Sequence, residues 1–337
     1  MKAMLLERIG KVAADNGPLV LADVPRPEPG PGEIRIRVSA CGVCHTELDE
    51  IEGRTPPPHL PVIPGHEVVG RVDSVGEGAG QYQPGERVGV GWIFCSNGAQ
   101  DENLSNEFRA TGRDANGGYA EFLIVREAYA YRIPNVFSDV AAAPLLCAGA
   151  VGYRALRLCE LQDGLPLGLT GFGGSAHIVL QLAKHCYPAS PIYVFARDPA
   201  TRAFAAELGA DWVGETRQSP PLAPAAIIDT TPAWQPIIQA LRNLAPGGRL
   251  VINAIRKEEA DKACLGELDY GTHLWQEKAI KSVANVCASD IREFLALAAE
   301  IPIKPAVEVY DFHRANMALR DLRFKPVQGS KVLRFGT

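Results

Sequence analysis

PLGLTGFGGSAHIVLQLAKH, residues 166–185, indicates the fold class of this chain. An apolar run typical of a buried strand leads into a glycine-rich turn, and a helical pattern follows the turn. The turn fits G-x-G-x-x-A, in which glycines allow a tight bend and let a pyrophosphate approach the backbone at a helix N-terminus. A glycine-rich turn in another kind of α/β sheet is the alternative. We expect a dinucleotide to bind at Gly171, Gly173, Gly174, Ser175 and Ala176.

Strands and helices alternate after this turn. PIYVFARDPATRAFAAELGAD (191–211) indicates a second strand and helix, and AAIIDTTP (225–232) and GGRLVINAI (247–255) indicate further buried strands. This alternation predicts an α/β fold with a parallel, doubly wound Rossmann sheet over residues 148–285. Asn253 and Ile255, at the end of the last of these segments, are further candidates for cofactor binding.

The first 147 residues are rich in glycine and proline and indicate short strands joined by turns. In PGPGEIRIRVSA (29–40) a turn is followed by alternation, with Ile34 and Ile36 on one face and Arg35 and Arg37 on the other. We expect an irregular, mostly antiparallel β-rich domain over 1–147. The pattern loosens again after residue 285, so residues 286–337 are expected to return to this first domain.

Composition limits the possible functions. The 337 residues are 47% hydrophobic and 22% charged, which is typical of a soluble globular protein. The net charge of −5 argues against nucleic acid or an anionic membrane as the main partner. The N-terminus lacks the unbroken apolar stretch of a signal peptide, so we expect a cytoplasmic protein. Its eight cysteines are then free thiols or metal ligands rather than disulfides.

CGVCH, residues 41–45, permits several kinds of site. It fits the attachment motif of a c-type haem, and its first four residues fit a redox dithiol or half of a zinc knuckle. Haem of this type is assembled outside the cytoplasm, and no small βαβ unit surrounds the motif. A catalytic zinc takes three Cys or His ligands and keeps one open position. His66 follows Cys44 by 22 residues and Cys147 lies far downstream, although each of these two residues alone is more typical of a structural role.

Six segments resemble the zinc-dependent medium-chain alcohol dehydrogenases, in the order of that family. They are GVCHTELD, GHEVVG, ERVGVGW, NGGYAEF, AAPLLCAG and GFGGSAH. The resemblance implies a GroES-like fold for the β-rich catalytic domain. It also implies one catalytic zinc bound by Cys44, His66 and Cys147, with Cys41 as a bystander.

The resemblance implies further roles around the zinc. Thr46 would pass the proton of the substrate alcohol outward, and His45 would face the cofactor pyrophosphate. Glu47 would orient the ligand histidine, and Glu67 would approach the zinc during water exchange. For both glutamates, ordinary surface carboxylates are the alternative.

Three departures from the family pattern concern the metal and the substrate. Residues 91–114 contain only Cys95 where many relatives have four cysteines, so we expect no structural zinc and one zinc per chain. Asp49 stands where well-known members have a relay histidine, either as a proton carrier or as a surface residue. Val151 replaces a threonine that contacts the nicotinamide.

A fourth departure concerns the choice of cofactor. The acid that binds the ribose 2′-hydroxyl is replaced by Ala196, and Arg197 and Asp198 follow. Asp198 either binds the ribose of NAD or caps the next helix, in which Pro199 is the first residue. The second interpretation leaves Arg197 free for a 2′-phosphate, so NADP is favoured over NAD.

These expectations define a function and its alternatives. We expect a dehydrogenase that uses zinc and NAD(P) to interconvert a small-molecule alcohol with an aldehyde or ketone, as a homodimer or homotetramer. One alternative is a zinc-free enone or quinone reductase of the same superfamily. The other is a non-catalytic, nucleotide-binding member.

Overall fold

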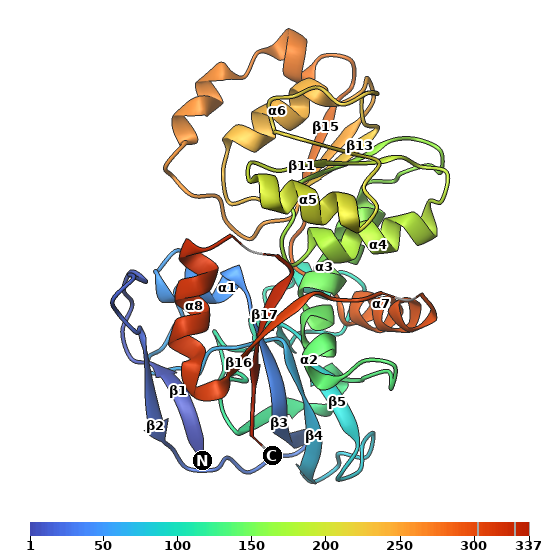
Figure 1. Cartoon of the computed structure of the whole chain (residues 1–337). Coiled ribbons are helices and arrows are strands. Elements are labelled where there is room, and N and C mark those ends of the chain that lie inside the picture. Colours follow the sequence, from blue (N-terminus) through green and yellow to red (C-terminus); the bar gives the residue numbers. More distant parts are fainter. Residues whose placement is uncertain (302, 327, 337) are drawn as a thin grey trace.

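A computed structural model describes residues 1–301, 303–326 and 328–336. It consists of a β-rich half, which holds both termini, and a half of parallel strands and helices (Figure 1). The expected α/β class, with a β-rich half and a Rossmann half, is confirmed. No helix in the described ranges is both long enough and apolar enough to cross a bilayer.

The Rossmann half is built on a six-stranded parallel sheet in the order β12-β11-β10-β13-β14-β15. Its strands are β10 (Leu167–Thr170), β11 (Ile192–Phe195), β12 (Trp212–Gly214), β13 (Ala226–Asp229), β14 (Arg249–Ile252) and β15 (Ala279–Ser282). The strand order reverses between β10 and β13, where sheets of this kind bind ligands at the carboxyl ends of the strands. The glycine turn follows β10 directly and therefore lies at this point.

Three helices follow strands of this sheet. They are α4 (Ala176–Cys186), α5 (Pro199–Glu207) and α6 (Gln235–Asn243). Asp198 caps α5, because its carboxylate accepts the N–H of Thr201 at 2.9 Å. Pro199 is the first helical residue.

The β-rich half contains a seven-stranded sheet in the order β16-β17-β3-β4-β5-β9, with β8 paired to β3. Its strands are β3 (Glu33–Val43), β4 (Val68–Val75), β5 (Arg87–Val90), β8 (Phe122–Arg126), β9 (Ala130–Arg132), β16 (Val307–Asp311) and β17 (Ser330–Arg334). β17 pairs antiparallel with the end of β3, so segments almost 300 residues apart lie side by side (Figure 1). Ile34 and Ile36 are fully buried, and Arg35 is buried through ion pairs with Asp73 and Glu28.

The remaining elements surround the two sheets. Strands β1 (Lys2–Leu6) and β2 (Leu19–Asp23) form one small sheet, and β6 (Ile93–Cys95) and β7 (Arg109–Ala110) form another. The helices are α1 (His45–Ile51), α2 (Asp139–Ala142), α3 (Ala148–Leu158), α7 (Ala288–Glu300) and α8 (Ala315–Phe324). Helix α3 packs against both α4 and α7 and lies between the two halves (Figure 1).

Candidate metal centre and cofactor site

Cys44 lies where a strand gives way to a helix. β3 ends at Val43, and Cys44 is the extended residue that precedes α1. The Glu47 carboxylate accepts the backbone N–H of Cys44 at 2.7 Å, which fixes the turn between strand and helix. The Thr46 hydroxyl lies 3.6 Å from the Cys44 sulfur, whereas His45 is exposed.

His66 reaches the same point from a tight turn. Gly65 has φ +100°, and a Cβ there would lie 2.4 Å from the Tyr119 ring, so only glycine fits. The imidazole is 1% exposed. Its Nδ1 lies 2.6 Å from Oε1 of Glu47, and its Nε2 lies 3.2 Å from the sulfur of Cys147. The Glu47 carboxylate thus lies beside the ring nitrogen that faces away from Cys147.

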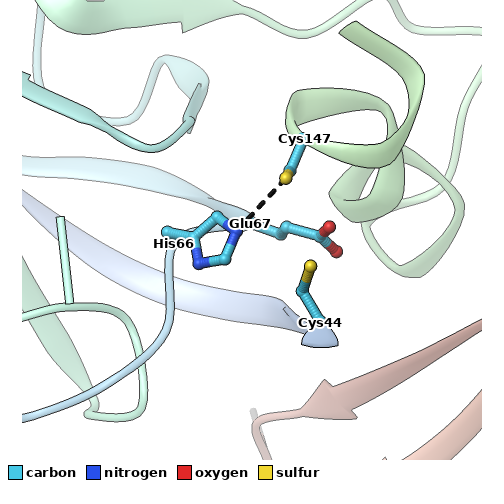
Figure 2. A group of neighbouring side chains, drawn as sticks. All are labelled: Cys44, His66, Glu67 and Cys147. Carbon is cyan, nitrogen blue, oxygen red and sulfur yellow. Dashed lines mark hydrogen bonds between the residues drawn. The ribbon is translucent and has the colours of Figure 1, made fainter. Parts of the chain in front are cut away.

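The second sulfur comes from Cys147, the residue before α3. One ligand atom from each of Cys44, His66, Glu67 and Cys147 lies within 4.8 Å of the others. Figure 2 shows the two sulfur atoms, the imidazole and the Glu67 carboxylate converging on a common point. Two thiols and an imidazole at this spacing are donors that fit Zn²⁺, and a carboxylate beside them is compatible with a fourth, exchangeable position.

The electrostatics of the cluster favour a metal-binding thiolate. Hydrogen bonds from Cys147 and His66 lower the pKa of the Cys44 thiol well below its usual value, although burial opposes this. The thiolate is the form of cysteine that binds metal. Burial raises the pKa of Glu67 well above its usual value, and the nearby negative charge of Cys44 adds to the effect.

Cys41 is outside the cluster. It lies within β3, opposite Val68 of β4 and Leu333 of β17, and is completely buried. Its sulfur packs close to Gly65 and Gly118, where an added Cβ would lie about 3 Å from it. Burial raises the pKa of this thiol well above its usual value, and the charges of Glu47 and Glu67 add to the effect.

The glycine turn provides the other half of the site. Gly171 has φ +79°, and the Cβ position of Gly173 faces open space, which fits the close approach of a pyrophosphate. The Ser175 hydroxyl donates to the carbonyl of Ala148 at 2.8 Å and lies 3.2 Å from the amide nitrogen of Asn253. Ala176 begins α4 and is buried.

Comparison with known proteins identifies the family. Residues 30–135 match the model of the alcohol dehydrogenase GroES-like domain. The protein named "Probable alcohol dehydrogenase AdhA" of Mycobacterium tuberculosis is 39% identical over 346 residues, covering 99% of this chain and 97% of that protein. The chain belongs to the medium-chain alcohol dehydrogenase family. An alcohol dehydrogenase of Geobacillus stearothermophilus is 31% identical over 99% of both chains. The structure of cinnamyl alcohol dehydrogenase SbCAD4 from Sorghum bicolor matches with a TM-score of 0.82 at 25% identity, covering 99% of this chain and 97% of that one.

Two predicted cofactor residues of this medium-chain dehydrogenase lie in loops at the carboxyl ends of other strands of the sheet. Arg197 is in the loop after β11 and Ile255 is in the loop after β14, and both side chains are exposed. Arg202, which the sequence did not single out, bonds to the carbonyls of Ala196 and Arg197 at 2.8 Å each. The Arg202 guanidinium thus lies beside the loop that carries Arg197. This contact forms only when the loop after β11 has folded.

The sequence also gave no indication of two residues near the metal centre. The Trp92 ring lies 6.1 Å from the His66 ring and 5.7 Å from that of Phe108, centroid to centroid. Glu50 on α1 is 1% exposed, and neither carboxylate oxygen has a hydrogen-bond partner in the described structure. Burial raises the pKa of Glu50 well above its usual value, and the charge of Glu47 adds to the effect. Charged residues are seldom buried unpaired, so sequence composition gave no reason to expect Glu50 inside.

Proposed function

We propose that this family member is a zinc- and NAD(P)-dependent alcohol dehydrogenase that interconverts a small-molecule alcohol with an aldehyde or ketone. The observation that carries the proposal is the convergence of Cys44, His66 and Cys147 in one partly buried cluster. The hydrogen bond from Ser175 of the glycine turn to Ala148, next to Cys147, supports a shared site for metal and dinucleotide.

Cys44, His66 and Cys147 would hold the zinc, and Glu67 is near enough to contact it during ligand exchange. Bound there, zinc supplies a Lewis acid that lowers the pKa of the alcohol, while the nicotinamide accepts the hydride. Thr46 is assigned to receive the hydroxyl proton, because its own hydroxyl lies beside the Cys44 sulfur. His45, exposed at the start of α1, is assigned to the cofactor pyrophosphate.

Asp49 is assigned to the outward path of the proton. It lies three residues after Thr46 and therefore on the same face of α1. The carboxylate is largely buried and paired with Arg54. Burial raises the pKa of Asp49, although Arg54 opposes the shift. Because a raised pKa is closer to neutral pH, this carboxyl is better matched to proton transfer than that of an exposed aspartate.

NADP is the proposed cofactor. The N-cap role of Asp198 supports this choice, because one oxygen of its carboxylate accepts both the N–H and the hydroxyl of Thr201. The exposed Arg197 is then available for a 2′-phosphate. Gly171, Gly173, Gly174, Ser175 and Ala176 are assigned to the pyrophosphate, and Asn253 and Ile255 to the rest of the cofactor.

The proposed assembly is a homodimer or homotetramer. Large apolar side chains at Leu268, Tyr270, Trp275 and Ile280 are exposed, and β15 is the last strand of its sheet. Light scattering should therefore give two or four times the mass of one chain.

A scan of primary and secondary alcohols with NAD⁺ and NADP⁺, and of the matching carbonyls with the reduced cofactors, tests the proposed function. We expect alcohol oxidation that is faster with NADP⁺. Reduction of enones or quinones alone would favour the zinc-free reductase. Tight nucleotide binding with no turnover of any substrate would favour the non-catalytic member.

A further inference from the structure

His177 is a completely buried histidine in the first turn of α4, outside the metal centre. Its Nδ1 lies 2.9 Å from the carbonyl oxygen of Gly173, the glycine whose Cβ position faces open space. Its Nε2 accepts the backbone N–H of Ala306 at 3.1 Å. One side chain therefore joins the dinucleotide turn to a segment that leads into the β-rich half.

These contacts define the protonation of the ring. A backbone N–H can only donate, so Nε2 must be the acceptor and the ring proton must be on Nδ1. Nδ1–H then donates to Gly173. Burial lowers the pKa of His177, which keeps the imidazole in this neutral form. Both ring nitrogens are used, and neither bond involves another side chain.

The Ala306 segment leads from His177 to the metal centre. The Ala306 carbonyl accepts the N–H of Ser330, at the start of β17, at 2.8 Å. β17 in turn pairs with β3, Lys331 opposite Val43, and Cys44 is the next residue of the chain. Gln181, one turn further along α4, strengthens the same junction by bonding both the N–H and the carbonyl of Lys304.

Ser175 makes the second connection. Its hydroxyl donates to Ala148, the residue after Cys147. The dinucleotide turn is therefore joined to the segments of both cysteine ligands, through Ser175 on one side and through His177 and Ala306 on the other. Hydride transfer requires the nicotinamide and the metal-held substrate at a fixed separation, and misplacement by about 1 Å can cost roughly a hundredfold in rate.

We propose that His177 is a positioning residue that holds the dinucleotide turn in register with the metal centre. The inference rests on the proposed function. The bond to Gly173 shapes the turn for the cofactor, and the bond to Ala306 sets where the turn lies relative to the β3 end that carries Cys44. Loss of the first weakens cofactor binding, and loss of the second slows the reaction of the bound cofactor.

Three substitutions separate the two bonds. His177→Phe keeps an aromatic ring but removes both bonds. His177→Asn keeps a donor at the position of Nδ1, and His177→Gln keeps an acceptor at the position of Nε2. Leu182→Ala, a buried residue of the same helix, is the control for lost stability without loss of either bond.

The dissociation constant of NADP⁺ by calorimetry, kcat at saturating substrates and the thermal midpoint are measured for each zinc-loaded protein. We expect His177→Phe to raise the dissociation constant and lower kcat, each roughly tenfold, the effect of one buried hydrogen bond. His177→Asn should lower kcat alone, and His177→Gln should raise the dissociation constant alone. Leu182→Ala should lower only the thermal midpoint.

The inference would be overturned if His177→Phe folds and its NADP⁺ dissociation constant and kcat both stay within about twofold of the parent. It would also be overturned if Leu182→Ala showed the same losses of cofactor affinity and kcat as His177→Phe. If His177→Phe does not fold, equal changes of both constants in the Asn and Gln variants would overturn it. A parent that binds neither nucleotide would instead refute the proposed function, and the inference with it.

Discussion

Two cysteines three residues apart have opposite environments. Cys41 is in the middle of a three-strand pairing, where β4 and β17 flank β3 and close glycines leave its sulfur no route to a ligand. Cys44 comes after the strand has ended, so the turn into α1 directs its sulfur toward His66 and Cys147. The C-x-x-C spacing therefore separates a packing thiol, Cys41, from the thiol that we propose binds the metal, Cys44.

We predict that Cys44→Ser loses zinc and at least about 100-fold in kcat/KM, because a neutral hydroxyl is a far poorer ligand than a thiolate. Cys41→Ser should keep both its zinc and its activity within roughly twofold, and lose about 1–2 kcal/mol of stability by burying a hydroxyl. Metal analysis, kinetics and urea unfolding of the two variants check this. Equal loss of zinc and activity in both would contradict the bystander role of Cys41.

At Arg197 the prediction concerns the cofactor. Two charge-assisted hydrogen bonds from its guanidinium to a 2′-phosphate are together worth about 1.5–4 kcal/mol in a solvent-open site. Arg197→Ala should therefore raise KM for NADPH by roughly tenfold to several hundredfold. KM for NADH should change little, because NADH lacks the phosphate.

A substitution of Asp198, in the same loop, tests the opposite choice of cofactor. If the parent prefers NADH and Asp198→Ala removes that preference, the carboxylate binds the ribose and this is an NAD enzyme. A drop in thermal midpoint without any change in cofactor preference is the result that the N-cap bond to Thr201 predicts.

At the scale of elements, the segment 91–114 is held in place without the cysteines of a structural zinc site. Glu102 lies in a short 3₁₀ turn and is 3% exposed. Its carboxylate accepts the N–H of Ala288, at the start of α7, at 2.7 Å and the hydroxyl of Tyr129 at 2.9 Å. The amide of Asn103 donates to Ala284 at 2.6 Å. A buried carboxylate at a helix N-terminus thus ties this segment to α7.

We predict that Glu102→Ala lowers the free energy of unfolding by about 2–4 kcal/mol, because it removes two hydrogen bonds to a charged group and leaves the Ala288 N–H unpaired. Asp101→Ala, at the exposed neighbouring position, should change it by less than about 0.5 kcal/mol. Chemical denaturation at neutral pH measures both. Equal stabilities of the two variants would show that Glu102 does not hold the segment.

Tyr129 gives this junction a pH dependence. Burial, together with the hydrogen bond to Glu102, raises its pKa from 10 to about 12. The unfolded chain therefore releases this proton first as the pH rises, and the contribution of the neutral tyrosine to stability is present below pH 10 and lost between about pH 10 and 12. Over that range the parent should lose about 1–2 kcal/mol more than Tyr129→Phe does. Parallel pH curves for the two proteins would contradict the assignment.

At the scale of the whole molecule, the sequence predicted what local patterns determine. The glycine turn, the cap at Asp198 and the strand–helix alternation each depend on residues close together in the chain. The contact of Glu102 with Ala288 joins residues 186 positions apart. Such pairings leave no periodic trace, because each partner alone resembles an ordinary surface residue.

The three residues of the candidate metal centre could be predicted from the sequence for a different reason. Cys44, His66 and Cys147 are also far apart in sequence, but their flanking segments resemble a known family, which assigned them together. Glu50 had no such support. Trp92 ends the segment ERVGVGW, which resembles the family, but the resemblance assigned it no role, so its place beside the cluster follows only from the packing of the fold. Resemblance therefore predicted which three residues belong together, and the structure brings them into one cluster. The aromatic side chain and the buried carboxylate beside that cluster required the structure.

The most direct measurement is zinc titration of the metal-free enzyme, with alcohol oxidation recorded at each addition. We predict that removal of zinc by a chelator abolishes NADP⁺ reduction, and that activity returns in full at about one zinc per chain. Full activity in the metal-free protein would contradict a zinc-dependent reaction and favour the zinc-free reductase. A requirement for close to two zinc ions would contradict the view that residues 91–114 hold no structural metal.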